Sequence, residues 1–249
     1  MQVLSVNHTK KAIVVGASSG IGEALALVLA KNGYEVGLVA RRQDVLLILQ
    51  KKIVTKSYVK RVDVADVTVA REQFQLLIQE MGKVDLVVLN AGVGIEDQEL
   101  DWKVQEQMIQ VNVLGFSALA QASIDYFKQQ RCGHLVGISS VLQARGMPGE
   151  AVYCATKSYV STLLQGIRAT LAVAEYNDIY VTDIRPGYVN TDMIKEKERA
   201  FWMITASDAA EGIYDAIKNK KHVSYVGKRW FFVALGMRIL PGWLLKLFR

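Results

Sequence analysis

The sequence predicts a doubly wound α/β fold, in which a parallel sheet of about seven strands is covered by helices on both faces. Short apolar runs rich in Val and Ile alternate along the chain with helical patterns of about a dozen residues or more. This alternation is typical of right-handed crossovers between parallel strands. A glycine-rich turn directly after the first apolar run supports the same fold, because this architecture binds ligands beyond the carboxyl ends of its strands.

The first half of the chain alternates strands and helices without interruption. Residues 12–15 form a short β-branched run, which predicts a strand buried on both faces. The helical pattern that follows stops at Asn32-Gly33, since Gly commonly follows the last turn of a helix. We then expect strands at residues 35–40, 58–62 and 84–89, and helices at residues 45–54 and 67–81.

The second half continues this pattern with longer helices. We expect helices at about 102–130, 151–174 and 207–219, and strands at 134–139, 179–184 and 223–226. The sequence contains neither an internal repeat nor a stretch rich in Ser, Gly and Pro that would form a linker. We therefore predict a single domain over residues 1–228 and an apolar, basic tail over residues 229–249.

The net charge of +6 is concentrated near one end of the sequence. Residues 216–249 contain eight Lys or Arg residues and neither Asp nor Glu, so the rest of the chain is slightly acidic. This distribution argues against a nucleic-acid partner. Cys132 and Cys154 form no C-x-x-C motif and the histidines are scattered, so we predict no metal site and a reducing compartment.

The first eleven residues lack the continuous apolar stretch of a secretory signal. With the cysteine usage, this predicts a cytoplasmic protein.

The turn Gly16-x-x-x-Gly20-x-Gly22 predicts a dinucleotide site. Gly16 permits a tight turn, Gly20 lets the backbone approach a pyrophosphate, and Gly22 allows close packing of helix and sheet. The N-terminus of the next helix offers N–H groups and a positive partial charge to the phosphates. No Gly-Lys-Ser/Thr follows, so a loop that hydrolyses a nucleoside triphosphate is not expected. A glycine-rich turn that binds nothing is the alternative.

The end of the second strand distinguishes between the two nicotinamide cofactors. An acidic residue there would bind the ribose 2′-hydroxyl of NAD, but the chain has Arg41 and Arg42. A guanidinium fork suits the 2′-phosphate of NADP, and Ser18 can add a hydroxyl contact. We predict NADP rather than NAD. The alternative is that both arginines are only solvated at the start of a helix.

Tyr153 and Lys157 are four residues apart and therefore share one face of the predicted helix. An ammonium beside a phenol favours the phenolate, and so lowers a pKa that is ordinarily about 10. By itself the spacing also fits a half-buried tyrosine next to a solvated lysine.

Seven motifs together resemble the short-chain dehydrogenase/reductase superfamily, in its short single-domain branch with a Rossmann fold. The resemblance covers about residues 11–227. The motifs are Gly16-x-x-x-Gly20-x-Gly22, Asp63-Val64, Asn90-Ala91-Gly92, Asn112, Ser139-Ser140, Tyr153-x-x-x-Lys157 and Pro186-Gly187.

The resemblance implies a catalytic set. Tyr153 is expected to be the general acid or base, and Lys157 to lower its pKa and to bind the nicotinamide ribose. Ser140, rather than Ser139, is expected to hold the substrate oxygen. Asn112 is expected to anchor a water that links Lys157 to solvent, although a lone Asn in a helix can also simply bond to its neighbours.

The resemblance also implies a cofactor site. Asp63 and Val64 are expected beside the adenine, the Asn90 to Gly92 turn against the cofactor, and Pro186-Gly187 beside the nicotinamide. The full expected set is Gly16, Ser18, Ser19, Gly20, Ile21, Gly22, Arg41, Arg42, Asp63, Val64, Asn90, Ala91, Gly92, Tyr153, Lys157, Pro186, Gly187, Val189 and Thr191.

The expected activity is NADP(H)-dependent interconversion of a carbonyl and an alcohol on a small, apolar substrate. A carbonyl reduced by hydride needs a positioned proton donor and hydrogen-bond donors at its oxygen, and the sequence supplies both. One alternative is a regulator that binds the dinucleotide without turnover, although it would not need the acid. Another, a methyltransferase that uses S-adenosylmethionine, would not explain the Tyr–Lys pair.

The stretch between Pro186 and Ser207 is expected to be a lid over the substrate. Apolar residues there either line a pocket or pin the lid to the body of the protein; they are Tyr188, Met193, Phe201, Trp202 and Met203.

The helix after Tyr153 is apolar on more than one side, and a second copy of the chain is its expected cover, as a homodimer or tetramer. In the tail, Trp, Phe and Leu alternate with basic residues. Such a segment fits peripheral membrane contact, a flap over the substrate pocket or a subunit interface.

Overall fold

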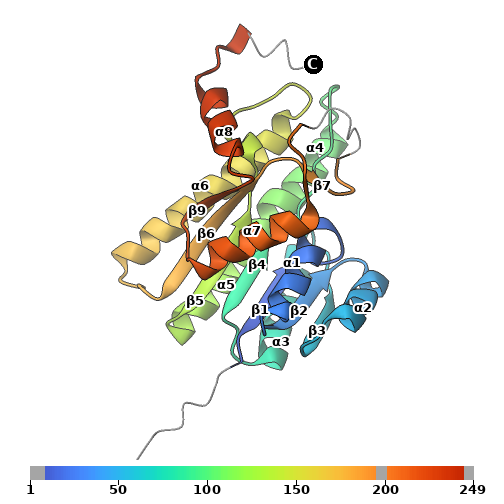
Figure 1. The fold of residues 1–249 in the computed structure, drawn as a ribbon, viewed down its shortest axis with the longest axis vertical. Helices are drawn as coiled ribbons and strands as arrows, with labels where there is room; N and C mark the ends of the chain where they lie inside the picture. The colour runs from blue at the N-terminus through green and yellow to red at the C-terminus, as the bar shows by residue number, and fades with distance from the viewer. Residues whose placement is uncertain (1–8, 195–200, 244–249) are drawn as a thin grey trace, which may run out of the picture.

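A computed structural model describes residues 9–194 and 201–243 (Figure 1). Its main sheet has seven parallel strands in the order β3-β2-β1-β4-β5-β6-β9, which confirms the predicted fold class. The strands are β1 (Lys11–Val15), β2 (Glu35–Ala40), β3 (Ser57–Arg61), β4 (Leu86–Leu89), β5 (Gly133–Ile138), β6 (Ile179–Pro186) and β9 (Val223–Val226). The strand order reverses between β1 and β4, where doubly wound sheets bind their ligands.

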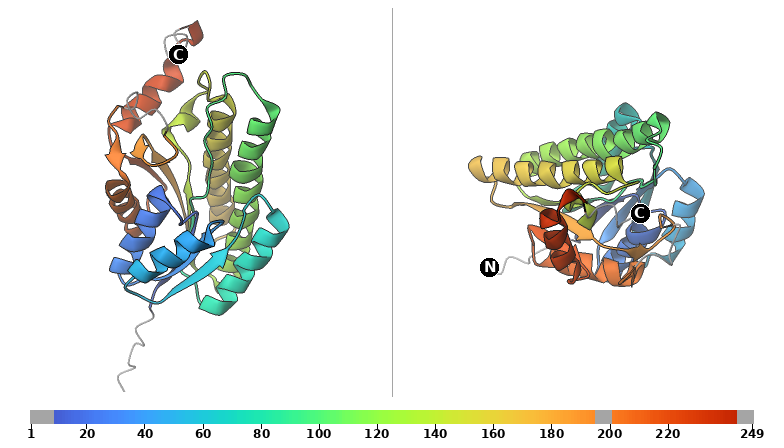
Figure 2. Two further views of the ribbon diagram at one scale, coloured as in Figure 1. Left: turned by 90° about the vertical axis from the view of Figure 1, so that its right-hand side faces the viewer. Right: turned by 90° about the horizontal axis from the view of Figure 1, so that it is seen from above.

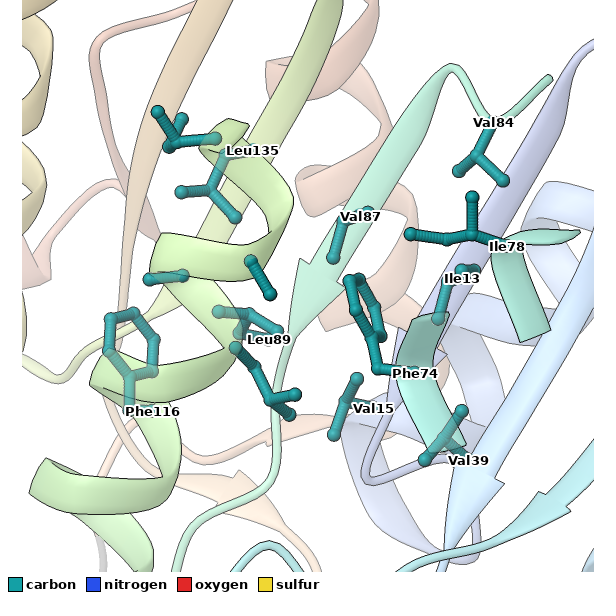
Figure 3. Close-up of a cluster of buried hydrophobic side chains, with 14 of the residues drawn as sticks. Ile13, Val15, Val39, Phe74, Ile78, Val84, Val87, Leu89, Phe116 and Leu135 are labelled. Atoms are coloured by element: carbon teal, nitrogen blue, oxygen red, sulfur yellow. The ribbon is translucent and has the colours of Figure 1, made fainter. Parts of the chain in front are cut away.

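Helices cover both faces of the sheet because successive residues of each strand point to opposite faces. In β1, Ile13 and Val15 belong to one buried cluster, whereas Ala12 and Val14 belong to the other. The first cluster lies under α3 (Val67–Met81), α5 (Phe116–Gln130) and α6 (Ala151–Val173), as Figure 3 shows for part of it. The second lies under α1 (Gly20–Lys31), α2 (Gln43–Lys52) and α7 (Ala206–Lys218).

Two long helices, α5 and α6, run side by side on one face of the sheet (Figure 2). The single helix expected near residues 102–130 is divided into α4 (Trp102–Ile109), a π-helical turn (Gln110–Gly115) and α5. Gly115 is required in this turn, because a Cβ there would lie 2.4 Å from the backbone oxygen of Val64. A single wider turn is too short to change the apolar pattern of the flanking helices noticeably, so the sequence pattern does not reveal it.

Three elements after β6 extend the predicted fold. A short parallel pair joins β7 (Val189–Asn190) to β8 (Ile204–Thr205), and α8 (Trp230–Ile239) forms the described part of the tail. Strands of two residues carry no detectable alternation, which explains why the sequence does not predict them. The division of the chain at residue 228 stays a prediction. Among the described helices, none combines the length and apolar character that crossing a bilayer requires.

A histidine lies inside the sheet. His134 on β5 is 7% exposed, and its Nε2 lies 2.7 Å from Oγ1 of Thr182 on β6. Thr182 in turn donates to the carbonyl of Lys221 at 2.6 Å. Burial disfavours the imidazolium and lowers the pKa of His134 to about 4, and the charge of Lys220 acts in the same direction.

Because of this histidine, we expect the free energy of unfolding to decrease as the pH is lowered. The unfolded chain binds the proton near pH 6.5 and the folded chain only near pH 4, so stability present at pH 7 is lost as the pH falls through this window. The loss between pH 7 and pH 4.5 is expected to be about 2 kcal/mol. Urea unfolding at the two pH values should show it for the wild type and for His222→Gln, an exposed control, but not for His134→Gln. An equal loss in both variants would contradict the assignment.

Candidate active site

Most of the predicted site residues lie at one edge of the sheet because they directly follow a strand, whereas Asn112, Tyr153 and Lys157 lie on helical segments. Parallel strands end at the same edge, so sequence positions far apart become neighbours there. Gly16 follows β1, Arg41 and Arg42 follow β2, Asp63 and Val64 lie beyond β3, Asn90, Ala91 and Gly92 follow β4, Ser139 and Ser140 follow β5, Pro186 ends β6 with Gly187 next, and Val189 lies in β7 with Thr191 just beyond.

The glycine turn is packed against the end of β4, backbone to backbone. A Cβ on Gly16 would lie 2.6 Å from the amide nitrogen of Ala91, and one on Gly22 would lie 2.1 Å from the oxygen of Gly16. Asn90 holds the turn by donating from Nδ2 to the oxygen of Gly16 at 2.9 Å. The helix α1 begins directly afterwards at Gly20. This close turn at a helix N-terminus fits the pyrophosphate of a dinucleotide.

Both arginines after β2 lie near the glycine turn, and they contact different partners. Nη2 of Arg42 donates to Oγ of Ser18 at 3.0 Å and to Oγ of Ser19 at 2.8 Å. Nη1 of Arg41 lies 3.9 Å from Oδ2 of Asp63, in an exposed ion pair. The Arg42 guanidinium therefore connects the end of β2 to the glycine turn. The alternative in which Arg42 is only solvated at the start of a helix does not describe these contacts.

Tyr153 and Lys157 share one face of α6, as their spacing predicts. Lys157 is 5% exposed, and its Nζ donates to the carbonyl of Ile138 at 3.0 Å. The same Nζ lies 5.7 Å from the centre of the Tyr153 ring. Burial lowers the pKa of Lys157 to about 8, while the negative charge of Asp183 acts in the opposite direction.

The pKa of Tyr153 differs from the sequence-based expectation. Burial raises it above its ordinary value of 10, and a hydrogen bond with Ser140 opposes this shift only in part. The expected lowering by Lys157 is therefore not found. The physical reason is that a buried phenolate is poorly solvated, and the nearby ammonium is directed to the Ile138 carbonyl.

Asn112 connects the loop after β4 to α6. Its Oδ1 accepts from the Val93 amide at 2.8 Å, and its Nδ2 donates to the Val93 carbonyl at 2.8 Å and to Oγ1 of Thr156 at 3.1 Å. Thr156 donates to the carbonyl of Tyr153 at 2.8 Å. The side chain of Asn112 is 1% exposed within the π-helical turn. Its expected role as a water anchor stays a prediction.

Comparisons with known proteins identify the family of the chain. The family model for short chain dehydrogenases matches residues 10–201. An uncharacterized oxidoreductase of Myxococcus xanthus (strain DK1622) is 36% identical over 190 residues, or 74% of each chain. The chain belongs to the short-chain dehydrogenase/reductase superfamily.

Solved structures of this superfamily have the same fold. An alcohol dehydrogenase from the archaeon Thermococcus sibiricus, complexed with 5-hydroxy-NADP, is 29% identical, with a TM-score of 0.77 over 88% of this chain and 96% of that one. A short chain dehydrogenase/reductase from Burkholderia phymatum, in complex with NAD, is 20% identical, with a TM-score of 0.85 over 96% of this chain and 95% of that one. The present protein is thus an NAD(P)-dependent dehydrogenase/reductase that acts on a small molecule.

A buried carboxylate in this dehydrogenase/reductase was not singled out from the sequence. Asp183 on β6 is 1% exposed and accepts from Ser139 Oγ at 2.5 Å, Ser161 Oγ at 2.7 Å and Arg185 Nε at 2.7 Å. Ser139 is thereby directed into the protein interior, whereas Ser140 bonds with Tyr153. An acidic residue inside the otherwise apolar strand 179–184 was the signal that could have revealed this network.

Aromatic side chains cluster beside the end of β6, where the sequence predicts the lid. Trp230, the first residue of α8, packs on Tyr188 and Phe201 with ring centres 5.4 Å and 5.0 Å away. Gly187 is required beside it, because a Cβ there would lie 2.1 Å from the indole ring. Trp202 also contacts Trp230. These contacts join the expected lid to the tail, although residues 195–200 of the lid lie outside the described residues.

Proposed function

We propose that the protein is an NADP(H)-dependent oxidoreductase that interconverts a carbonyl and an alcohol on a small, apolar substrate. The observation that carries the proposal is the convergence of Ser140, Tyr153 and Lys157 at the strand edge that also holds the glycine turn. The aromatic wall formed by Tyr188, Phe201, Trp202 and Trp230 supports an apolar substrate.

In this proposal Tyr153 is the proton donor to the carbonyl oxygen. Reduction places negative charge on that oxygen, and the bound nicotinamide dinucleotide supplies the hydride. Because burial raises the pKa of Tyr153, its phenol keeps its proton until the oxygen becomes basic. Ser140 donates a second hydrogen bond to the same oxygen, and the ammonium of Lys157 opposes the charge left on Tyr153. In the reverse direction Tyr153 accepts the proton.

Cofactor binding in this proposal uses the residues already assigned by position. The glycine turn with Ser18, Ser19 and Ile21 holds the pyrophosphate, and Asp63 and Val64 hold the adenine. The nicotinamide end is held by Asn90 to Gly92, Lys157, Pro186, Gly187, Val189 and Thr191. The contact that a Cβ on Gly20 would make with Thr191, at 2.9 Å, supports a single binding crevice that joins both ends.

Replacement of Tyr153 by Phe tests the catalytic role. We expect the rate of reduction of apolar ketones and aldehydes, followed by NADPH absorbance, to fall at least about 100-fold, because the general acid is removed. The affinity for NADPH should change little. Tyr159→Phe is the matched control, since Tyr159 lies on the same helix but 41% exposed, where its hydroxyl contacts Ser117.

Full activity of Tyr153→Phe would remove the assigned role. A wild-type protein that binds NADPH but turns over no carbonyl compound of the panel would instead favour the alternative, a dinucleotide-binding regulator.

The preference for NADP over NAD depends on Arg42 and Arg41. Ser18 and Ser19 orient the Arg42 fork next to the glycine turn, where a 2′-phosphate would make two parallel charge-assisted bonds. Arg42→Ala is expected to weaken NADPH binding about 10- to 100-fold and NADH binding less than about threefold. Fluorescence titration measures both, with the exposed Arg71→Ala on α3 as control. An equal loss for the two cofactors would contradict a phosphate-specific contact.

We also propose that the protein is a homo-oligomer. An apolar groove between α5 and α6, on the side away from the sheet, is lined by Ile124, Leu163, Ile167 and Leu171 with neighbouring polar residues. A second copy would cover this groove and the half-exposed Tyr159. Sedimentation at micromolar concentration should show a dimer or tetramer, and Ile167→Glu should give a monomer because it places a charge in the contact. A monomeric wild type would contradict the proposal.

A further inference from the structure

The outer face of α8 is apolar and exposed. Trp230 and Ala234 face the protein and are buried, but the opposite side of the helix carries residues that remain open to solvent. These are Phe231 at 47%, Phe232 at 72%, Leu235 at 51% and Ile239 at 79% exposed, followed by Trp243 at 70%. A helix that is apolar on all sides normally has a partner on each side. We call this exposed set the α8 face.

The body of the protein fixes the direction of the α8 face. At its start, Trp230 is packed against Gly187 and Tyr188. At its end, Nη1 of Arg145 donates to the carbonyls of Met237, at 3.3 Å, and Leu240. The helix is therefore anchored at both ends, and Figure 1 shows it projecting beyond the sheet and the other helices. An exposed apolar surface on a fixed, projecting element is accessible to a large planar partner.

The charges around the α8 face identify the chemistry of that partner. Lys228 and Arg229 precede the helix and Arg238 lies in its last turn, all of them exposed. The whole stretch 216–249 contains no Asp or Glu. Aromatic and aliphatic side chains flanked by cations match the interface of a membrane with anionic headgroups. A two-fold contact between copies would instead bring these cations close together without a carboxylate from this stretch to compensate them.

We propose that the α8 face binds the surface of an anionic membrane, with the helix in the interface plane and the protein outside the bilayer. The aromatic and aliphatic side chains enter the boundary between headgroups and acyl chains, and the basic residues contact the headgroups. The proposal concerns binding alone and does not depend on the catalytic assignment.

Vesicle flotation of the full-length protein tests the proposal. The probes are vesicles of phosphatidylcholine with about 30% phosphatidylglycerol, and vesicles of phosphatidylcholine alone. We expect most of the protein to float with the anionic vesicles at low salt, and several-fold less with the neutral ones. Binding to the anionic vesicles should fall in about 0.5 M salt, because salt screens the basic residues.

Two substitutions and a control assign the binding to this face. Phe232→Glu is expected to lower the vesicle-bound fraction at least about tenfold, since it places a carboxylate in the apolar contact. Val173→Glu, at the end of α6, makes the same change on an 87% exposed residue and should leave binding unchanged. Arg238→Gln should reduce binding to anionic vesicles and leave binding to neutral ones as it was. Unchanged affinity for NADPH verifies that each variant is folded.

Three results would overturn the proposal. The first is a wild type that floats with neither vesicle, and the second is a Phe232→Glu variant that binds as the wild type does. The third is sedimentation in which Phe232→Glu dissociates an oligomer, because the face would then be a contact between copies.

Discussion

The close approach of two backbones, at the ends of β1 and β4, is the constraint on which the site depends. Neither Gly16 nor Gly22 has space for a Cβ, because Gly16 lies against the backbone of Ala91 and Gly22 lies against the oxygen of Gly16. This contact lies where the strand order reverses, at the carboxyl edge where doubly wound sheets bind their ligands. Without it, the loop after β4 and the turn after β1 would be separated by the width of a side chain.

The same loop after β4 is coupled to α6 through hydrogen bonds. Val93 contacts Asn112, Asn112 donates to Thr156, and Thr156 donates to the carbonyl of Tyr153. Beneath α6, Asp183 accepts hydrogen bonds from Ser139 after β5, from Ser161 on α6 and from Arg185 on β6. The loop after β4 and the Tyr–Lys pair are therefore two parts of one packed unit, because each is held by polar groups that have little access to water.

The sequence predicts the fold well, and it also predicts which residues share one edge of the sheet, because both follow from local patterns. Apolar runs give the strands, and parallel strands bring Gly16, Asn90 and Ser140 to one edge whatever their separation in the chain. What it does not predict depends on packing. The π-helical turn, the two-residue strands and the network of Asp183 leave no periodic trace, and the pKa of Tyr153 depends on burial that spacing cannot reveal.

The turn after β6 is covered by an aromatic residue from much later in the sequence. Trp230 packs beside Gly187, and Arg145 donates a hydrogen bond to a carbonyl in the last turn of α8. Every strand of the main sheet precedes this helix in the sequence. Because the indole packs against the turn that follows β6, a displacement of α8 is expected to move that turn as well. Proteolytic removal of α8 would uncover Gly187 and Tyr188, which its first side chain contacts.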